Sequence, residues 1–267
     1  MLKTMNENKN EIPLESILNE KKPVLFLDYD GTLTPIVKRP EDAILSPGMK
    51  QALEDCASLF SIAVISGRDL DDLKDKVKID TLIYAGSHGF RISGPGGLYK
   101  EHEQSEEILP ELDRLEKKMN EISRSIDQGI QIDRKRYAIA VHYRNAEEEN
   151  VPDIIRKVNK LMDQTPGFKV GGGKKIVEIR PDVDWDKGKA LLWIMQKLGV
   201  TDKKKFIPFY IGDDVTDEDA FKVIQDDGWG ILVGPEEGKK SAARFTLPDV
   251  NSVKDFLHNL ASTVKKE

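Results

Sequence analysis

The chain has 267 residues, of which 39% are hydrophobic and 33% are charged, and its formal net charge at pH 7 is −6. This acidic balance, without a basic stripe interleaved with aromatic residues, argues against a nucleic-acid partner. The single cysteine, Cys56, excludes an intrachain disulfide and a cysteine-based zinc site. No apolar run approaches the roughly 20 residues that a membrane span needs, and residues 1–22 lack the apolar core of a signal peptide. We therefore expect a cytoplasmic protein with no membrane partner.

After the polar lead-in of residues 1–22, the chain alternates between short apolar runs and helical patterns. Strands that are apolar throughout and alternate with helices are typical of an α/β fold with a doubly wound, Rossmann-like parallel sheet. Ser46 followed by Pro47 is a strong helix start, because serine caps a helix and proline suits its first turn. The elements expected here are a short helix near 14–19, strands at 24–28, 61–66 and 81–89, and helices that begin at Pro47 and near Leu70.

Between residues 103 and 181 the pattern changes to helix, hairpin, helix, hairpin, which predicts a separate α+β domain inserted in the first. The second hairpin is expected to turn at Gly171–Gly173. The parallel pattern then resumes and runs to the end of the chain. The inserted elements are a helix at 106–124, a hairpin at 130–133 and 137–144, a helix at 151–163 and a hairpin at 168–181; those that follow are a helix at 186–198, strands at 206–214, 229–234 and 243–247, and a helix at 251–263.

Asp28 and Asp30 stand directly after the first expected strand, where an apolar run ends in two carboxylates. A turn or helix cap is the ordinary explanation of one aspartate in such a place. A calcium loop is a second explanation, but the glycine and glutamate that it requires are replaced here by Leu33 and Arg39. A phosphate-binding P-loop is excluded as well, because GGGKK at 171–175 lacks the required spacing.

Two other expected strands also end in small and polar residues, Ser66-Gly67-Arg68 and Ser87-His88. Ligands of doubly wound sheets bind beyond the carboxyl ends of the strands, so we expect these groups to gather at one edge of the sheet. His88 is equally well explained as a hydrogen-bonded histidine at a strand end.

A second acidic group, Asp213 and Asp214, lies at the end of the strand expected at 206–214. Carboxylates crowded at one strand end repel one another unless a cation lies between them, and hard oxygen ligands suit Mg²⁺. The acidic residues at 217–219 are explained as helix-start residues, because Thr216–Asp219 matches a capping box.

Lys187 begins the helix expected at 186–198, where the helix dipole disfavours a cation. A solvated surface lysine is the ordinary explanation, but a nearby anion would offset this location and makes Lys187 a better candidate than Lys189. The whole set suits phosphoryl transfer: a carboxylate attacks phosphorus, a second one handles the proton, and Mg²⁺, Lys187 and Ser66 bind phosphate oxygens.

The chain carries a set of motifs that resembles the haloacid dehalogenase superfamily, phosphatases with an aspartate nucleophile and a mobile cap. YAGSHG, VHYR and the KxxxEIRP stretch of 174–181 resemble one branch, the trehalose-6-phosphate phosphatases. This resemblance covers residues 23 to about 260 and implies a core at 23–102 and 182–267 with an inserted α+β cap at 103–181. The superfamily motifs are DYDGT at 28–32, SGR at 66–68, DKGKAL at 186–191 and GDDVTDEDAF at 212–221.

The resemblance implies that Asp28 is the nucleophile, which forms an aspartyl-phosphate, and that Asp30 protonates the leaving sugar oxygen. Mg²⁺ would be held by Asp28, the backbone carbonyl of Asp30 and Asp213, with Asp214 in support. The other core residues expected to bind the substrate or shape its loop are Ser66, Lys187, Thr32, Gly67 and Arg68.

The sugar is expected to bind the inserted domain. Lys174 and Glu178 would share one face of a strand if that strand begins by Lys174, and His142 and Arg144 share a face of the first hairpin. A solvated sheet face is the ordinary explanation of these four residues.

The resemblance implies an enzyme that hydrolyses trehalose 6-phosphate, a small-molecule sugar phosphate. We expect the protein to be a monomer. A phosphatase of sucrose phosphate or of a glycosyl-glycerate phosphate would have the same core. A phosphomutase would use the same two aspartates. A non-catalytic sugar-phosphate sensor would have lost the nucleophile, the acid or the metal ligands, all of which are present in this sequence.

Overall fold

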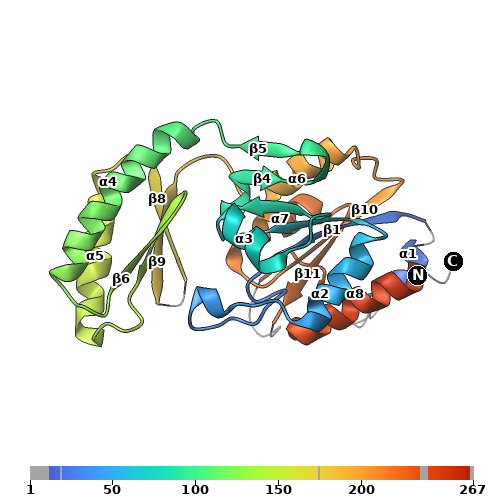
Figure 1. Cartoon of the computed structure of the whole chain (residues 1–267), viewed down its shortest axis with the longest axis horizontal. Helices are drawn as coiled ribbons and strands as arrows, with labels where there is room; N and C mark the ends of the chain where they lie inside the picture. The colour runs from blue at the N-terminus through green and yellow to red at the C-terminus, as the bar shows by residue number, and fades with distance from the viewer. Residues whose placement is uncertain (1–11, 19, 174, 235–239, 265–267) are drawn as a thin grey trace, which may run out of the picture. The chain divides into compact units, whose positions relative to one another are not determined.

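The protein forms two compact units (Figure 1). The core unit is made of Met1–Lys100 and Trp185–Glu267, and the inserted unit is Glu101–Asp184. In the part of the chain that is described, no helix is long and apolar enough to cross a membrane. The computed structural model describes residues 12–18, 20–173, 175–234 and 240–264.

The described residues of the core unit are built on an eight-stranded sheet in the order β12-β11-β10-β1-β2-β3-β4-β5. The neighbours from β12 to β3 pair in parallel, and β4 adds to β3 in the antiparallel direction. The strands are β1 Lys22–Leu27, β2 Ser61–Ile65, β3 Ile83–Gly86, β4 Arg91–Ser93, β5 Tyr99–Glu101, β10 Phe206–Gly212, β11 Trp229–Val233 and β12 Phe245–Leu247.

Both faces of the central strands β1, β2, β3, β10 and β11 are buried, because residues of each of these strands belong to two different hydrophobic clusters. Leu25 and Leu27 of β1 belong to the cluster that includes α2, α3 and α8, whereas Val24 and Phe26 belong to the cluster that includes α6 and α7. A strand buried on both faces needs apolar side chains at every position, which explains the continuous apolar runs of the sequence. The helices of the core unit are α1 Leu14–Leu18, α2 Pro47–Ala57, α3 Leu70–Val77, α6 Lys187–Leu198, α7 Glu218–Ile224 and α8 Val250–Val264, with short 3₁₀ turns η1 Pro40–Asp42, η2 Ser87–Gly89, η3 Pro95–Gly97 and η5 Val215–Asp217.

Side-chain caps fix where the two core helices α2 and α6 begin. The predicted start of α2 is confirmed, because Ser46 Oγ accepts a hydrogen bond from the backbone N–H of Met49 at 3.2 Å and Pro47 opens the helix. In α6 the side chain of Asp186 accepts from the backbone N–H of Lys189 at 2.8 Å. This cap makes Lys187 the first residue of α6.

The inserted unit is an antiparallel sheet in the order β6-β7-β9-β8, and its helices α4 and α5 contact these strands. Ile139, Val141 and Ile179 are buried, whereas Glu178 and the other residues of opposite parity in β9 are partly exposed. One mostly parallel sheet and one separate antiparallel sheet confirm the predicted α/β fold class. The elements of this unit are α4 Ser105–Arg124, β6 Gln131–Lys135, β7 Ala138–His142, η4 Glu148–Asn150, α5 Val151–Asp163, β8 Phe168–Gly173 and β9 Ile176–Pro181.

The predicted turn at Gly171–Gly173 is wrong, since these glycines lie in β8, where Gly171 pairs with Glu178. A triplet of glycines is a common turn signal, but here the pairing of β8 with β9 overrides it. A Cβ atom on Gly171 would come within 2.8 Å of Nη2 of Arg180, which is the end of a long side chain that can move aside. The hairpin turns after the glycines, and Lys174 lies outside the described residues.

The strand predicted at 81–89 is shorter in the structure, because β3 ends at Gly86 and the chain turns away through η2. Ser87 and His88 both adopt positive φ angles, 50° and 56°, which a strand does not allow. The sequence analysis did not predict β4 or β5, each of which has only three residues and no apolar run.

Phe209→Ala should destabilise the core unit by about 3–5 kcal/mol, because removal of a buried aromatic side chain loses its burial and leaves a cavity. Phe209 is fully buried in β10, with its ring centroid 5.2 Å from that of Trp229 and 6.1 Å from that of Phe256. Urea unfolding followed by tryptophan fluorescence measures the change. Ile44→Ala is the control; Ile44 is 72% exposed, so its loss should stay within about 0.5 kcal/mol. Equal effects of the two changes would contradict this account of the core.

Candidate active site

Three polar residues stand at the carboxyl edge of the core sheet, each directly after a strand. Asp28 follows β1, Asp213 follows β10 and Ser66 follows β2. Strand β1 lies between β10 and β2, and its parallel register pairs Leu27 with Ile211. The backbone N–H of Asp28 also donates to the carbonyl of Ile211 at 2.9 Å, so the ladder continues up to the aspartate itself. The strand order therefore brings these side chains to one edge.

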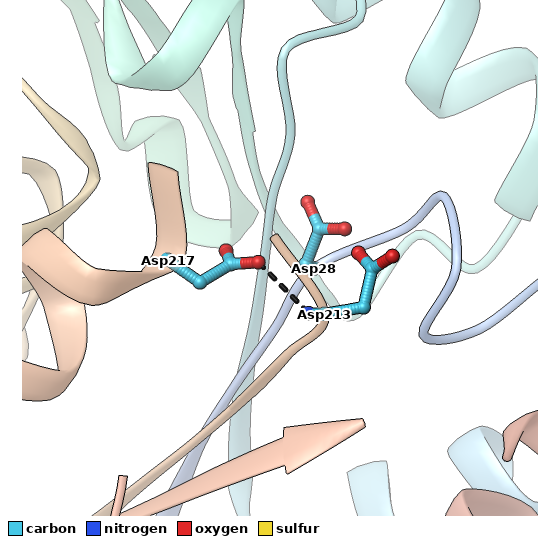
Figure 2. A group of neighbouring side chains, drawn as sticks. All are labelled: Asp28, Asp213 and Asp217. Carbon is cyan, nitrogen blue, oxygen red and sulfur yellow. Dashed lines mark hydrogen bonds between the residues drawn. The ribbon is translucent and has the colours of Figure 1, made fainter. Parts of the chain in front are cut away.

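Three carboxylates converge at this edge. Each of Asp28, Asp213 and Asp217 offers an oxygen, and these oxygens all lie within 4.8 Å of one another. Figure 2 shows the three side chains coming together from two segments of the chain, with the backbone of Asp213 hydrogen-bonded to Asp217. Oxygens at this spacing are suited to share one cation.

Asp217 is the organising residue that the sequence analysis missed. It is fully buried, and its Oδ1 accepts hydrogen bonds from Lys187 Nζ at 2.7 Å and from the hydroxyl of Tyr210 at 2.6 Å. Its Oδ2 accepts from the backbone N–H groups of Asp213 at 2.9 Å and Asp214 at 3.0 Å. These four bonds fix both the carboxylate and the chain that carries Asp213.

The capping box predicted at Thr216–Asp219 is wrong, because the box begins two residues earlier. Asp214 is the N-cap of η5 and Asp217 is its third residue, each bonded to the backbone of the other. The carboxylate of Asp214 also accepts from the hydroxyl of Thr216 at 2.6 Å. The sequence carried no periodic signal for Asp217, because Asp214 is extended and residues 213–217 do not form one helical turn.

Lys187 lies between two of the carboxylates. Its Nζ donates to Oδ1 of Asp28 and to Oδ1 of Asp217, both at 2.7 Å, and its side chain is only 3% exposed. Burial by itself would lower the pKa of this lysine, but Asp217 and Asp28 together raise it above its usual range. Lys187 is therefore a permanent positive charge held against Asp28.

The single positive charge of Lys187 does not balance the acidic cluster. Burial, above all, raises the pKa of Asp28 well above its ordinary value, and Asp217 and Asp213 raise it further while Lys187 opposes them. Burial also raises the pKa of Asp213 to about 7, with added repulsion from Asp217 and Asp214. In both shifts burial and neighbouring carboxylates outweigh the opposing effect of Lys187, and a cation among these oxygens would favour the charged forms. The donor set, which consists of carboxylate oxygens, fits a hard divalent cation.

The carboxylate of Asp30 points to Arg68. Nε of Arg68 donates to Oδ2 of Asp30 and Nη2 donates to Oδ1, both at 2.7 Å, which makes a bidentate ion pair. Ser66 is buried, and its Oγ accepts from the backbone N–H of Arg68 at 3.2 Å. The SGR motif thus supports Asp30 through its arginine and places the serine at the end of β2.

Thr32 and Gly67 complete the loops around this edge. Thr32 is fully buried, and its Oγ1 has no hydrogen-bond partner among the described residues. Gly67 lies under the ring of His88, since a Cβ atom there would come within 3.0 Å of two ring atoms. Gly67 therefore allows the loops after β2 and β3 to approach each other closely.

In the inserted unit, Glu178 lies in an ionic group on β6 and β9. Its Oε1 accepts from Lys135 Nζ at 3.1 Å, and its Oε2 lies 3.4 Å from Nε of Arg180. The sequence analysis did not predict a role for Lys135. This residue lies on the same face of β6 as Asp133, because side chains two positions apart on a strand share a face. Burial lowers the pKa of His142, whose charge neighbours include Asp133, Lys135 and Glu178. Strand β7 ends at His142, so Arg144 lies in the turn beyond it.

Gly31→Ala should weaken binding of a divalent cation by about tenfold or more, the scale seen when groups that support a metal ligand are disturbed. Gly31 has a φ of +83°, and a Cβ atom there would fall 2.1 Å from Oδ2 of Asp213. Calorimetric titration of the substrate-free protein with MgCl₂ measures the affinity. Gly96→Ala is the matched control, because Gly96 also has a positive φ, +68°, but has open space around it. Equal affinities in the two variants would show that this close contact does not shape the site.

Comparison with known proteins places this geometry in a family. The sequence profile of the trehalose-phosphatase family matches residues 26–251. The chain is 38% identical over 264 residues to the probable trehalose-phosphate phosphatase 2 of Oryza sativa subsp. japonica, covering 91% of this chain and 69% of that protein. It is 41% identical over 259 residues to an uncharacterized glycosyl hydrolase of Mycobacterium tuberculosis (strain H37Rv), covering 95% of this chain. The alignment covers only 19% of that hydrolase, so the chain spans about a fifth of its length.

A solved structure agrees with the sequence matches. The C-terminal domain of the C. albicans trehalose-6-phosphate phosphatase matches with a TM-score of 0.80 at 23% identity, over 95% of this chain and 98% of that one. An identity this low shows a shared fold and nothing more. The family profile, in contrast, covers most of the sequence and confirms the resemblance that the motifs predicted. The chain belongs to the trehalose-phosphatase family.

Proposed function

We propose that this chain is a Mg²⁺-dependent phosphatase that hydrolyses trehalose 6-phosphate to trehalose and phosphate. The observation that carries the proposal is the position of Asp28, which has one oxygen on Lys187 and lies within 4.8 Å of Asp213 and Asp217. Membership of the trehalose-phosphatase family supports the choice of substrate.

Asp28 would act as the nucleophile. Its carboxylate oxygen attacks phosphorus, a new P–O bond forms, and the bond from phosphorus to the sugar oxygen breaks. Asp30 would give a proton to the departing sugar oxygen. Water then attacks the aspartyl-phosphate, Asp30 takes a proton from that water, and phosphate leaves while Asp28 is regenerated. The same two carboxylates thus serve both halves of the reaction.

The positive groups of the site would bind the phosphoryl oxygens. Lys187 supplies a fixed charge beside Asp28, and the hydroxyl of Ser66 donates a hydrogen bond. Thr32 would do the same, which is supported by its buried Oγ1 without a partner among the described residues. Gly67 and Arg68 are proposed to lie next to the substrate as parts of the same loop.

Mg²⁺ would be held by Asp28, the backbone carbonyl of Asp30 and Asp213. Asp217 is a further candidate ligand, since its oxygen belongs to the same group of three. Asp214 would support the site by capping η5, the turn that carries Asp217. When bound, this ion neutralises charge on the phosphoryl group and orients it for in-line attack.

We propose that the inserted unit is a cap that binds the sugar. Glu178 would accept hydrogen bonds from sugar hydroxyls, because a carboxylate is a strong acceptor. Its contacts with Lys135 and Arg180 support this role by fixing the direction of its oxygens. His142, Arg144 and Lys174 are proposed to contribute further polar contacts.

Asp28→Asn should lower kcat for trehalose 6-phosphate by a factor on the order of 10⁴ or more, the scale of loss expected for a covalent nucleophile. EDTA should stop phosphate release by the unmodified protein, and added Mg²⁺ should restore it. Phosphate release is measured directly. Asp80→Asn, an exposed aspartate of the core unit, is the control and should leave activity unchanged.

A panel of sugar phosphates tests the substrate in the same assay. We expect the highest kcat/KM for trehalose 6-phosphate, compared with sucrose phosphate and a glycosyl-glycerate phosphate. A higher value for another member would remove the trehalose assignment. Appearance of an isomerised sugar phosphate without release of phosphate would identify a mutase instead.

Glu178→Gln should raise KM for trehalose 6-phosphate about tenfold, because a hydrogen bond to a charged acceptor is worth about 1.5–3 kcal/mol. It should have little effect on p-nitrophenyl phosphate, which lacks the sugar. Lys157→Gln on α5 is the control, since Lys157 is a surface residue paired with Asp153. The same loss on both substrates would argue that Glu178 stabilises the inserted unit and does not recognise the sugar.

A further inference from the structure

Both oxygens of Asp30 are occupied by one guanidinium. Arg68 donates from Nε to Oδ2 and from Nη2 to Oδ1, each at 2.7 Å, so the two groups meet in a planar fork. Such a bidentate pair is stronger and more directional than a single charged hydrogen bond. Arginine has five N–H donors and no acceptor, so it can hold a carboxylate but cannot take a proton from it.

Arg68 is itself held from other sides. Nη1 donates to Oδ2 of Asp72 at 2.8 Å, and Nη2 donates to the backbone carbonyl of Pro40, also at 2.8 Å. The guanidinium lies 5.3 Å from the centre of the Tyr29 ring. The side chain of Arg68 is only 10% exposed, whereas that of Asp30 is 40% exposed. In this pair, Arg68 is the fixed partner and Asp30 is the side chain with room to turn.

This arrangement does not aim Asp30 at a leaving group. Each carboxylate oxygen has two lone pairs, and in the fork one lone pair of each oxygen accepts from Arg68, so the plane of the carboxylate faces the guanidinium. To give a proton to the sugar oxygen, Asp30 is expected to turn at least one oxygen away from Arg68.

We propose that Arg68 is a positioning residue that stores Asp30 in a fixed resting orientation and acts on the reaction through Asp30. This inference rests on the proposed function. It replaces a direct contact of Arg68 with the phosphate by an indirect role, because the donors of Arg68 already serve Asp30, Asp72 and the carbonyl of Pro40.

The leaving group of the substrate separates the two roles. A sugar oxygen needs a proton from Asp30 as it departs, whereas p-nitrophenolate leaves without one. The ratio kcat/KM includes only the steps up to loss of the leaving group, so later hydrolysis of the aspartyl-phosphate does not enter. A residue that acts through Asp30 affects the sugar phosphate selectively, and a residue that binds phosphate affects both substrates.

Arg68→Gln should lower kcat/KM about 10- to 100-fold for trehalose 6-phosphate, a part of the roughly 10²- to 10⁴-fold contribution of general acid–base catalysis, and by less than about threefold for p-nitrophenyl phosphate. Calorimetric titration with inorganic phosphate in the presence of Mg²⁺ should show an unchanged affinity. Arg68→Lys should not restore the rate, because an ammonium group cannot form the fork. In the double variant with Asp30→Asn, the loss should not exceed that of Asp30→Asn alone.

Four results would each overturn this proposal. They are equal losses on the two substrates, weaker phosphate binding by Arg68→Gln, a rate restored by Arg68→Lys, and additive losses in the double variant. Arg91→Gln is the matched control, because Arg91 also pairs with an aspartate, Asp71, at 2.9 Å and its side chain is 16% exposed. This variant should keep unchanged activity on both substrates. If Arg68→Gln does not fold, Asp72→Asn decides: a smaller but selective loss supports the proposal, and an equal or absent loss overturns it. If the unmodified protein hydrolyses neither substrate, the proposed function fails, and this inference fails with it.

Discussion

The site depends on one buried ionic group, in which Lys187 lies between Asp28 and Asp217 with both contacts at 2.7 Å. The three side chains are at most 7% exposed, so water does little to screen their charges. Removal of charges from water is unfavourable unless every charge finds a partner with good geometry. The fold provides that geometry by ending β1 and β10 side by side and by starting α6 at the lysine. Tyr210 and two backbone N–H groups complete the shell around Asp217. The group remains one positive charge short, which is the physical reason why a cation fits there.

The sequence predicts the core fold well because burial of a parallel sheet on both faces leaves a direct signature in composition. The apolar runs at 24–28 and 61–66 coincide with β1 and β2 to within a few residues. The same argument gave the position of Asp28 and Asp213, since the residue after such a run lies at the edge where parallel strands end. The start of α2 could also be predicted, because Ser46 caps the helix and Pro47 suits its first turn, and both effects depend only on neighbouring residues.

Other features were hidden because a local explanation was sufficient for them. Asp217 was assigned to a helix start, and it does take part in a capping box, but its contact with Lys187 joins residues 30 positions apart, and its contact with Tyr210 comes from strand β10. The glycines at 171–173 looked like a turn, whereas they continue strand β8 and pair with β9. The contact of Arg68 with Asp30 joins residues 38 positions apart, so spacing alone gave no signal. Tertiary contacts decided each of these cases.

The two cations of the site differ in shape, and this difference matches the roles proposed for their carboxylates. Lys187 is a compact charge that contacts Oδ1 of Asp28, so it would orient the proposed nucleophile by one oxygen and leave the other for phosphorus. Arg68 is a planar fork that takes both oxygens of Asp30. A nucleophile must present a bare oxygen at every turnover, whereas an acid–base group must be restrained until a proton is needed. A lysine beside Asp28 and an arginine beside Asp30 therefore suit the proposed roles of these carboxylates as nucleophile and as acid–base group.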